Sequence, residues 1–349
     1  MSSHSQAITT ANRIQSRIDR QLTASTKNLR NRASSSDHCA SMLPLPCQSS
    51  DIENETCTTP AGKASSGCRT DEPLLGTELE KPILRWAGGK SWLVKHLDRF
   101  LPKTFNNYHE PFLGSGAIFF NLRPGNKSFL SDVNSELINA HSQIREDPDG
   151  VLQVLERFRN TVDDYYQIRE TTSSSPTEKA ARFIFLNRTC FNGLYRVNRE
   201  GEFNVPYGFK SYKQLFDPDR FRRLSELLKH ATLWCGDFED SLSNVREGDL
   251  VFLDPPYTVS HIKNGFVKYN DKLFSWGDQK RLVSFIEKVR SRGARYILTN
   301  ANHESIRDLF GRKDTPITVC RSNVIGGRGA ARGTIEEYVF TNVNREESL

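Results

Sequence analysis

Four consecutive residues, Asp254, Pro255, Pro256 and Tyr257, combine the chemical groups needed to hold a flat, amine-bearing ring. They follow the apolar run 250–253, which is typical of a buried strand. Two prolines directly after a strand fix the backbone and end its hydrogen-bonded ladder. The turn would therefore present a carboxylate, rigid carbonyl groups and an aromatic ring at the carboxyl end of a strand, where open α/β sheets bind ligands. Locally, the same residues also fit a turn in which Asp254 caps a helix.

A second group of residues predicts a cofactor-binding turn. Residues 110–116 read Glu-Pro-Phe-Leu-Gly-Ser-Gly and join a predicted strand to a predicted helix. Two glycines separated by one residue allow a ligand to approach the backbone and leave helix amides free, although they also fit an ordinary tight turn. Asp132 ends the next predicted strand, a spacing that suits a carboxylate binding ribose hydroxyls. Phe119 interrupts the GxGxxG fingerprint, which argues against a nicotinamide cofactor.

Two further segments could complete such a site. Residues 85–91, Arg-Trp-Ala-Gly-Gly-Lys-Ser, are not a Walker phosphate-binding loop, because Leu84 stands where that loop needs a glycine. They form either a flexible helix start or a second backbone clamp, with Lys90 neutralising a carboxylate. Asp237 and Phe238 follow another predicted strand, where the acid could accept a hydrogen bond from an adenine amino group. The alternative is that Asp237 caps the next segment.

Alternating elements predict how these groups are brought together. The expected strands are 107–111, 128–132, 232–235, 250–253, 295–299 and 335–341. The expected helices are 90–101, 115–122, 134–145, 177–188, 219–229, 278–292 and 303–310. Strands that alternate with helices favour an α/β fold with a doubly wound, largely parallel sheet. Residues from about 140 to 230 interrupt this pattern with helices and a hairpin, and are interpreted as an insertion.

Composition separates the first 76 residues from the rest. They contain no Phe, Trp or Tyr, whereas the remainder holds all 35 aromatic residues. Such a segment cannot bury enough apolar surface to offset the entropy of ordering, so residues 1–76 are predicted to be a disordered, Ser- and Thr-rich extension. Their basic, Ser-rich start weakly resembles an organelle transit peptide; a dispensable tail or a misassigned start codon is the alternative.

Charge and cysteine content narrow the class of protein. The net charge of +6, from 48 basic and 42 acidic residues, is compatible with a polyanionic partner. No apolar run is long enough to span a membrane. The seven cysteines contain no CxxC pair, so no metal site is expected, and free thiols suit a reducing, cytoplasmic location.

Residues 185–208, FLNRTCFNGLYRVNREGEFNVPYG, interleave Asn, Gly, Arg and aromatic side chains. These side chains suit base edges, phosphates and base stacking. The same composition also fits an ordinary exposed hairpin.

Taken in order, these motifs closely resemble those of the Dam-like DNA adenine-N6 methyltransferases of the D12 class. The resemblance covers residues 81 to about 342. It rests on KPILRWAGGKS, EPFLGSG, SDVNSELI, NRTCFNGLYRVNREGEFNVPYG, GDF and LDPPY. Residues 1–76 have no counterpart.

The resemblance implies a Rossmann-like, seven-stranded sheet that binds S-adenosylmethionine (SAM). The catalytic domain would comprise residues 77–140 and 231–349, and residues 141–230 would form an inserted target-recognition domain. The cofactor-binding residues that it implies are Trp86, Ala87, Lys90, Pro111, Phe112, Gly114, Ser115, Gly116, Asp132, Asp237, Phe238 and Asp254.

The implied reaction is methyl transfer from SAM to N6 of adenine in duplex DNA, with GATC as the expected site and a monomer or weak dimer on DNA. The implied catalytic residues are Asp254, Pro255, Pro256 and Tyr257, which would receive a flipped adenine. Asp254 and the Pro255 carbonyl would accept its N6 hydrogens, and Tyr257 would stack on its ring.

Six residues are implied to bind DNA, namely Arg85, Phe191, Asn192, Leu194, Arg196 and Pro206. Arg196 would read guanine, Leu194 and Pro206 would meet a thymine methyl group, and Phe191 and Asn192 would enter the base stack. Family members often have Tyr at the position of Phe191 and Lys at that of Arg85.

Two alternatives stay open at this stage. A methyltransferase acting on RNA or protein is disfavoured because Asp254, rather than an Asn, precedes the two prolines, and because of the inserted hairpin. A catalytically inactive DNA-binding homologue is disfavoured because every motif residue is intact.

Overall fold

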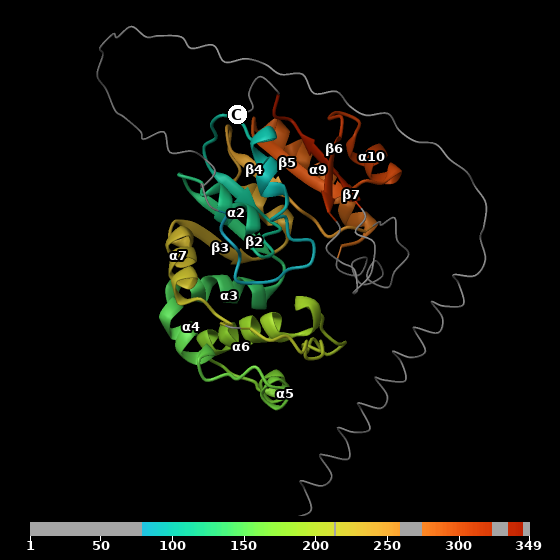
Figure 1. The fold of residues 1–349 in the computed structure, drawn as a ribbon. Helices are drawn as coiled ribbons and strands as arrows, with labels where there is room; N and C mark the ends of the chain where they lie inside the picture. The colour runs from blue at the N-terminus through green and yellow to red at the C-terminus, as the bar shows by residue number, and fades with distance from the viewer. Residues whose placement is uncertain (1–78, 213, 259–273, 323–333, 345–349) are drawn as a thin grey trace, which may run out of the picture. The chain divides into compact units, whose positions relative to one another are not determined.

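A seven-stranded sheet runs through the described part of the chain (Figure 1). In spatial order its strands are β3 (Ala231–Cys235), β2 (Ser128–Asp132), β1 (Tyr108–Glu110), β4 (Leu250–Leu253), β5 (Arg295–Ala301), β7 (Thr334–Thr341) and β6 (Ile317–Ser322). The strands from β3 to β5 are parallel, whereas β7 runs antiparallel to both β5 and β6. The predicted doubly wound α/β fold is confirmed, and β6 is a strand that the sequence reading missed.

The computed structural model describes residues 79–212, 214–258, 274–322 and 334–344. All of these residues belong to one of two compact units of the chain, Thr70–Leu349. The predicted extension 1–76 lies outside the described residues. The predicted domain boundaries within residues 77–349 stay a prediction.

Helices cover both faces of the sheet. Along β4, Leu250 and Phe252 join one buried cluster, whereas Val251 and Leu253 join another, as expected for a strand buried on both faces. The first cluster includes residues of the 3₁₀ helix η1 (Leu93–Arg99), α2 (Ala117–Leu122) and α3 (Ser135–Glu146). The second includes residues of the 3₁₀ helix η3 (Phe238–Asn244), α9 (Trp276–Ser291) and α10 (Glu304–Phe310).

The helix predicted at 90–101 is wrong in type and extent, because the structure has only η1 there. Gly88 has a left-handed backbone, with φ of 80°, and Trp92, the residue before η1, provides no side-chain cap. Without a cap, the exposed amides of a first α-helical turn lose a stabilising partner.

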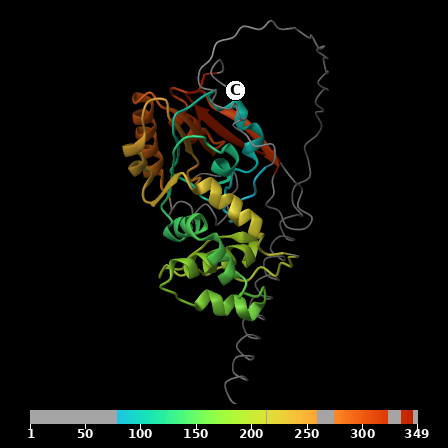
Figure 2. The same cartoon turned by 90° about the vertical axis from the view of Figure 1, so that its left-hand side faces the viewer.

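Helices α4 (Pro148–Leu155), α5 (Val162–Glu170), α6 (Pro176–Thr189) and α7 (Pro218–Leu228) continue from α3. Figures 1 and 2 show α4, α5 and α6 as a layer beside the sheet. Each helix begins at a side chain that caps its first amides, namely Asp147, Thr161, Ser175 and Asp217. Residues of all four helices enter the first buried cluster, so this layer shares a hydrophobic core with the sheet.

Residues 190–212, called the arm below, leave the end of α6. Antiparallel bridges join Cys190 to Tyr207 and Val197 to Phe203, as the predicted hairpin requires. The bridges are isolated and no regular strand forms among the described residues of the arm. Its shape therefore depends on a few specific contacts rather than on a continuous ladder.

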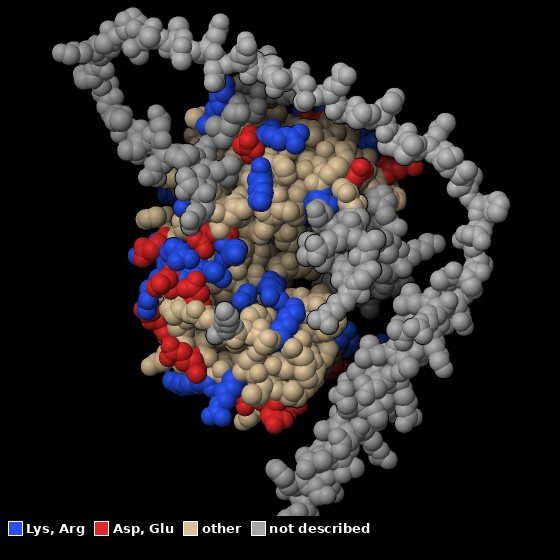
Figure 3. Space-filling model, viewed as in Figure 1, with Lys and Arg blue, Asp and Glu red and all other residues tan. Residues whose placement is uncertain are grey.

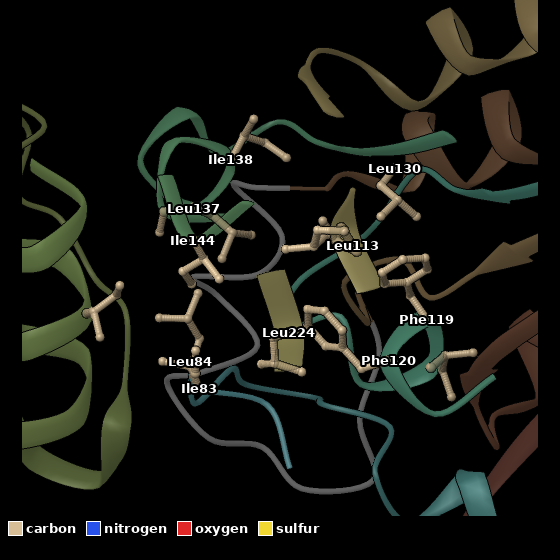
Figure 4. Close-up of a cluster of buried hydrophobic side chains, with 14 of the residues drawn as sticks. Ile83, Leu84, Leu113, Phe119, Phe120, Leu130, Leu137, Ile138, Ile144 and Leu224 are labelled. Atoms are coloured by element: carbon tan, nitrogen blue, oxygen red, sulfur yellow. The ribbon is translucent and has the colours of Figure 1, made fainter. Parts of the chain in front are cut away.

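The segment before η1 is held between the sheet and α6. Asn187 of α6 is buried and bonds both backbone groups of Arg85, accepting from its N–H and donating to its carbonyl oxygen, each at 2.7 Å. Ile83 and Leu84 are buried, and Figure 4 shows them beside Ile144 of α3. These contacts fix the position of the residues that follow Arg85.

Asn187→Ala should lower the free energy of unfolding by about 1–3 kcal/mol, because it leaves two backbone groups of Arg85 without partners. Urea unfolding followed by circular dichroism would measure the change. Asn139→Ala is the matched control, since Asn139 makes an exposed hydrogen bond to the Pro176 carbonyl. Equal losses for the two variants would contradict the clamp.

Candidate active site

Three acidic side chains lie at the carboxyl ends of neighbouring strands. Glu110 ends β1, Asp132 ends β2 and Asp254 follows β4. The strand order reverses between β1 and β4, which is where ligand clefts form in open α/β sheets. Burial raises the pKa of Glu110 to about 8; the hydrogen bond from Tyr108, at 2.8 Å, opposes the increase, and the charges of Asp254 and Asp132 add to it. The edge is therefore buried, acidic and crowded.

A buried ion pair fixes Asp254. Lys90 is only 3% exposed, and its Nζ lies 2.6 Å from Asp254 Oδ1 and donates to the Gly88 carbonyl at 2.8 Å. Thr299 Oγ1 donates to the same Oδ1 at 2.8 Å. Burial raises the pKa of Asp254, while Lys90 and Thr299 lower it. Among the described residues these contacts all engage Oδ1. They therefore orient the whole carboxylate, although Oδ2 takes no part in them.

Tyr257 is held by a residue that the sequence reading missed. Its hydroxyl donates to Glu337 Oε2 at 2.6 Å, and Lys90 Nζ lies 4.8 Å from the centre of its ring. Glu337, in β7, is 2% exposed; its carboxylate pairs with Arg321 of β6 and lies 3.8 Å from Lys90 Nζ. An acid inside the otherwise apolar core of β7 is the signal that could have indicated a paired, buried group.

The glycine turn after β1 is shaped for close approach. Gly114 and Gly116 have φ of 49° and 71°, and a β carbon on Gly114 would lie 2.8 Å from the Trp86 ring. Gly114 N donates to Asp132 Oδ2 at 3.0 Å. Burial lowers the pKa of His141 to about 4, so its neutral ring donates from Nε2 to the Gly114 carbonyl, at 3.0 Å. Pro111 and Ser115 are buried within the same turn.

Trp86 connects this turn to the arm. Its ring stacks on Tyr195 with centroids 5.4 Å apart and an angle of 29°. The Tyr195 hydroxyl in turn donates to Glu136 of α3, at 2.9 Å. Trp86 therefore contacts both the glycine turn and the arm, while Ala87 beside it is exposed.

Asp237 caps η3, as one of the two sequence interpretations required. It accepts a hydrogen bond from Glu239 N at 3.0 Å and pairs with Arg281 at 2.7 Å. Phe238 is buried and stacks on Phe112, with centroids 5.4 Å apart. Contact of Asp237 and Phe238 with an adenine stays a prediction.

The arm carries five of the six predicted DNA-binding residues. Phe191 is 51% exposed, and Asn192 and Pro206 are exposed as well. Phe191 N donates to the Pro206 carbonyl at 2.8 Å, so these two residues face each other across the arm. Leu194 is partly buried and packs against the hydrophobic core, which leaves less of its side chain for a ligand.

Arg196 is held in place within the arm. Its Nε donates to Asn204 Oδ1 at 2.7 Å, and Asn204 N donates to the Arg196 carbonyl at 3.1 Å. A guanidinium that is already oriented loses less side-chain entropy when it binds a partner.

Comparison with known proteins decides the family. Residues 86–319 match the family of D12 class N6 adenine-specific DNA methyltransferases. The chain belongs to this family. The type II methyltransferase M1.LlaDCHI of Lactococcus lactis subsp. cremoris is 34% identical over 275 residues, which cover 75% of this chain and 95% of the relative.

Two other relatives carry names of the same kind. The DNA adenine methylase of Escherichia coli K12 is 30% identical over 266 residues, covering 74% of this chain and 94% of the relative. The DNA N-6-adenine-methyltransferase of Escherichia phage P1 is 35% identical over 274 residues, covering 75% of this chain and 35% of the phage protein. The predicted family and enzyme class, an adenine-specific DNA methyltransferase, are confirmed.

A group of three cations lies where the arm meets the segment before η1. This cationic group consists of Arg85, Arg188 and Lys210. The guanidinium carbons of Arg85 and Arg188 lie 5.9 and 5.5 Å from the centre of the Tyr212 ring. Burial lowers the pKa of Lys210, and the charges of Arg85 and Arg188 lower it further. No carboxylate of the described residues forms an ion pair with these three cations. On the face drawn in Figure 3, Lys and Arg atoms gather between the sheet and the helix layer.

The described residues contain neither a metal-binding group nor a membrane-spanning helix. Within them, no group of three or more His, Cys, Asp or Glu residues is arranged to hold a metal ion. No helix in the described part of the chain is long and apolar enough to cross a membrane.

Glu110→Gln tests the acidity of the sheet edge. Glu110 has a higher pKa when folded than its ordinary value of 4.5, so the folded protein binds its proton more tightly and loses stability as the pH rises from about 4.5 to about 8. The variant lacks this loss. The measured quantity is the free energy of unfolding of the variant minus that of the wild type. This difference should become more positive by about 2–5 kcal/mol between pH 4.5 and about pH 8, and should then level off.

Urea unfolding at pH 5, 6.5, 8 and 9 would measure that difference. Glu200→Gln, on the exposed tip of the arm, is the control and should show no such trend. A difference between Glu110→Gln and wild type that is constant from pH 5 to 9 would contradict the assignment.

Glu337→Gln tests the support beneath Tyr257. Glutamine can still accept from the Tyr257 hydroxyl, but it removes the charge that pairs with Arg321 and faces Lys90. Because small displacements of positioning groups are costly, the single-turnover rate of methyl transfer should fall about 10- to 100-fold, with little change in KM for DNA. Glu336→Gln is the matched control, since the neighbouring Glu336 is exposed and bonds Asn302. Equal rates in the two variants, both folded by circular dichroism, would refute the role.

Proposed function

We propose that this chain transfers a methyl group from SAM to N6 of adenine in duplex DNA, at GATC. One observation carries the proposal: at the switch point of the sheet, Lys90 and Thr299 fix Asp254 through a single oxygen, beside a glycine turn. Such an arrangement provides a preorganised acceptor next to a place where a ligand can approach the backbone closely.

The donor set of the site suits SAM. Of the four carboxyl groups at this edge, Glu110 is largely protonated at neutral pH because its pKa is raised to about 8. The other three, those of Asp132, Asp254 and Glu337, are partly or fully buried and meet two neighbouring cations, Lys90 and Arg321, among the described residues. SAM would offset this excess, because its sulfonium and ammonium charges outweigh its single carboxylate, and it supplies a methyl group that is activated for displacement. Trp86, the Gly114 turn and Asp132 would hold it, because the turn admits close contact and Asp132 stands at the end of β2.

The adenine must leave the base stack to reach such a site, because its N6 is inaccessible within a duplex. Asp254 Oδ2 and the Pro255 carbonyl would accept the two N6 hydrogens and direct the nitrogen lone pair at the methyl group. The Tyr257 ring, anchored by Glu337, would stack on the base. Positioning and fixed acceptors supply the acceleration, and no covalent enzyme intermediate is required.

The arm and the cationic group support DNA as the substrate. Arg85, Arg188 and Lys210 would neutralise phosphates, whereas Arg196 would read a guanine edge. GATC as the site rests on the resemblance of the arm to that of Dam-like enzymes. A monomer or weak dimer on DNA, in the cytoplasm, belongs to the same proposal.

The test is methyl transfer from labelled SAM to two duplexes, one with a single GATC and one with that site scrambled. The proposal expects label on adenine N6 of the GATC duplex alone. Label in both duplexes would remove GATC and keep the adenine methyltransferase. Label in neither would refute the proposed reaction.

Asp254→Ala is the matching variant for this assay. It removes the acceptor, so transfer should fall at least about 100-fold, as when a preorganised transition-state contact is deleted. SAM binding, followed by calorimetry, should largely persist. Asp219→Ala, an exposed acid on α7, should transfer at the wild-type rate. Normal turnover by Asp254→Ala would refute its role.

A further inference from the structure

Phe209 is an exposed aromatic residue that the proposed mechanism leaves unused. Its side chain is 74% exposed, and its backbone is left-handed, with φ of 52°. This conformation costs a bulky residue about 1–2 kcal/mol and favours glycine or asparagine. An apolar ring that is mostly exposed to water gains little from burial to offset this backbone cost, which points to a role outside the fold.

The backbone on both sides of Phe209 is anchored. The Tyr207 hydroxyl bonds Asn160, and Asn160 Nδ2 donates to the Lys210 carbonyl at 2.8 Å. Gly208 N donates to the Thr189 carbonyl at 2.9 Å. The Phe209 ring packs edge-to-face against Tyr207, with centroids 4.9 Å apart. The ring is therefore presented on a fixed base, which reduces the entropy lost when it binds a partner.

The surroundings of Phe209 indicate the chemistry of that partner. Lys210 follows it directly and lies close to Arg85 and Arg188, and these cations have no carboxylate partner among the described residues. The same arm carries Phe191, 51% exposed. Exposed rings beside unpaired cations suit nucleic acid, because rings stack on bases while cations bind phosphates. A purely apolar partner would leave the cations without a counter-charge.

We propose that Phe209 stacks on a base of the bound duplex that base flipping leaves unstacked, and thereby stabilises the opened DNA. This inference rests on the proposed function. Phe209 then acts as a DNA-positioning residue, separate from the groups that hold the adenine.

Phe209→Gly and Phe209→Asn remove the ring and suit a positive φ, so both variants should keep the Tm of the wild type or raise it. Their affinity for a GATC duplex should fall about 5- to 150-fold, the range expected for loss of one base–aromatic contact. The rise in fluorescence of 2-aminopurine at the target position should shrink as well. The dependence of affinity on salt should not change, because no charge is removed.

Two further variants serve as controls. Phe209→Trp keeps an aromatic ring and should bind within about threefold of wild type. Val162→Ala removes an exposed apolar side chain at the start of α5, outside residues 190–212, and should bind like wild type.

The 2-aminopurine fluorescence of the duplex with wild-type protein separates the role of Phe209 from the proposed function. If wild type raises the fluorescence and Phe209→Gly does so equally, the role of Phe209 is refuted and the proposed function stands. If both ring-deleted variants lose Tm, the ring is structural and the inference fails. If wild type neither binds nor opens the duplex, the proposed function fails and the inference fails with it.

Discussion

The buried pair of Lys90 and Asp254 is the interaction on which the other features of the site depend. Removing two charges from water is costly unless they meet in good geometry with further hydrogen bonds. Here Thr299 and the Gly88 carbonyl provide those bonds. Lys90 reaches Asp254 from a segment far away in sequence, so the chain must deliver it accurately. The backbone bonds from Asn187 to Arg85 hold that segment in place.

The same segment joins the two places to which we assign cofactor binding and DNA binding. Its Trp86 touches the glycine turn on one side and stacks on Tyr195 of the arm on the other. A ligand that moves Trp86 must also affect Tyr195, which is tied to α3 through Glu136. The structure thus links the glycine turn to the arm through the packed rings of Trp86 and Tyr195.

The sequence predicted correctly those elements whose positions depend on neighbouring residues in the chain. Strands β2 and β4 lie at the predicted residues, and the Asp254 motif ends β4 as expected, because apolar runs followed by proline have few alternatives. β6 was missed because its residues, Ile317–Ser322, alternate weakly and depend on pairing with β7. Glu337 was missed for a similar reason: its importance comes from Tyr257, Arg321 and Lys90, which only the folded chain brings together.

The distribution of charge favours entry of a base alone. At the sheet edge, the carboxylates of Asp132, Asp254 and Glu337 outnumber the cations Lys90 and Arg321, whereas the base of the arm holds Arg85, Arg188 and Lys210 without carboxylate partners among the described residues. Phosphates are therefore attracted to the arm and repelled from the edge. In the proposed reaction a neutral base carries no such penalty and would gain the acceptors of Asp254 and Pro255. Opposite charge at the two places would thus separate the DNA backbone from the base in the proposed reaction.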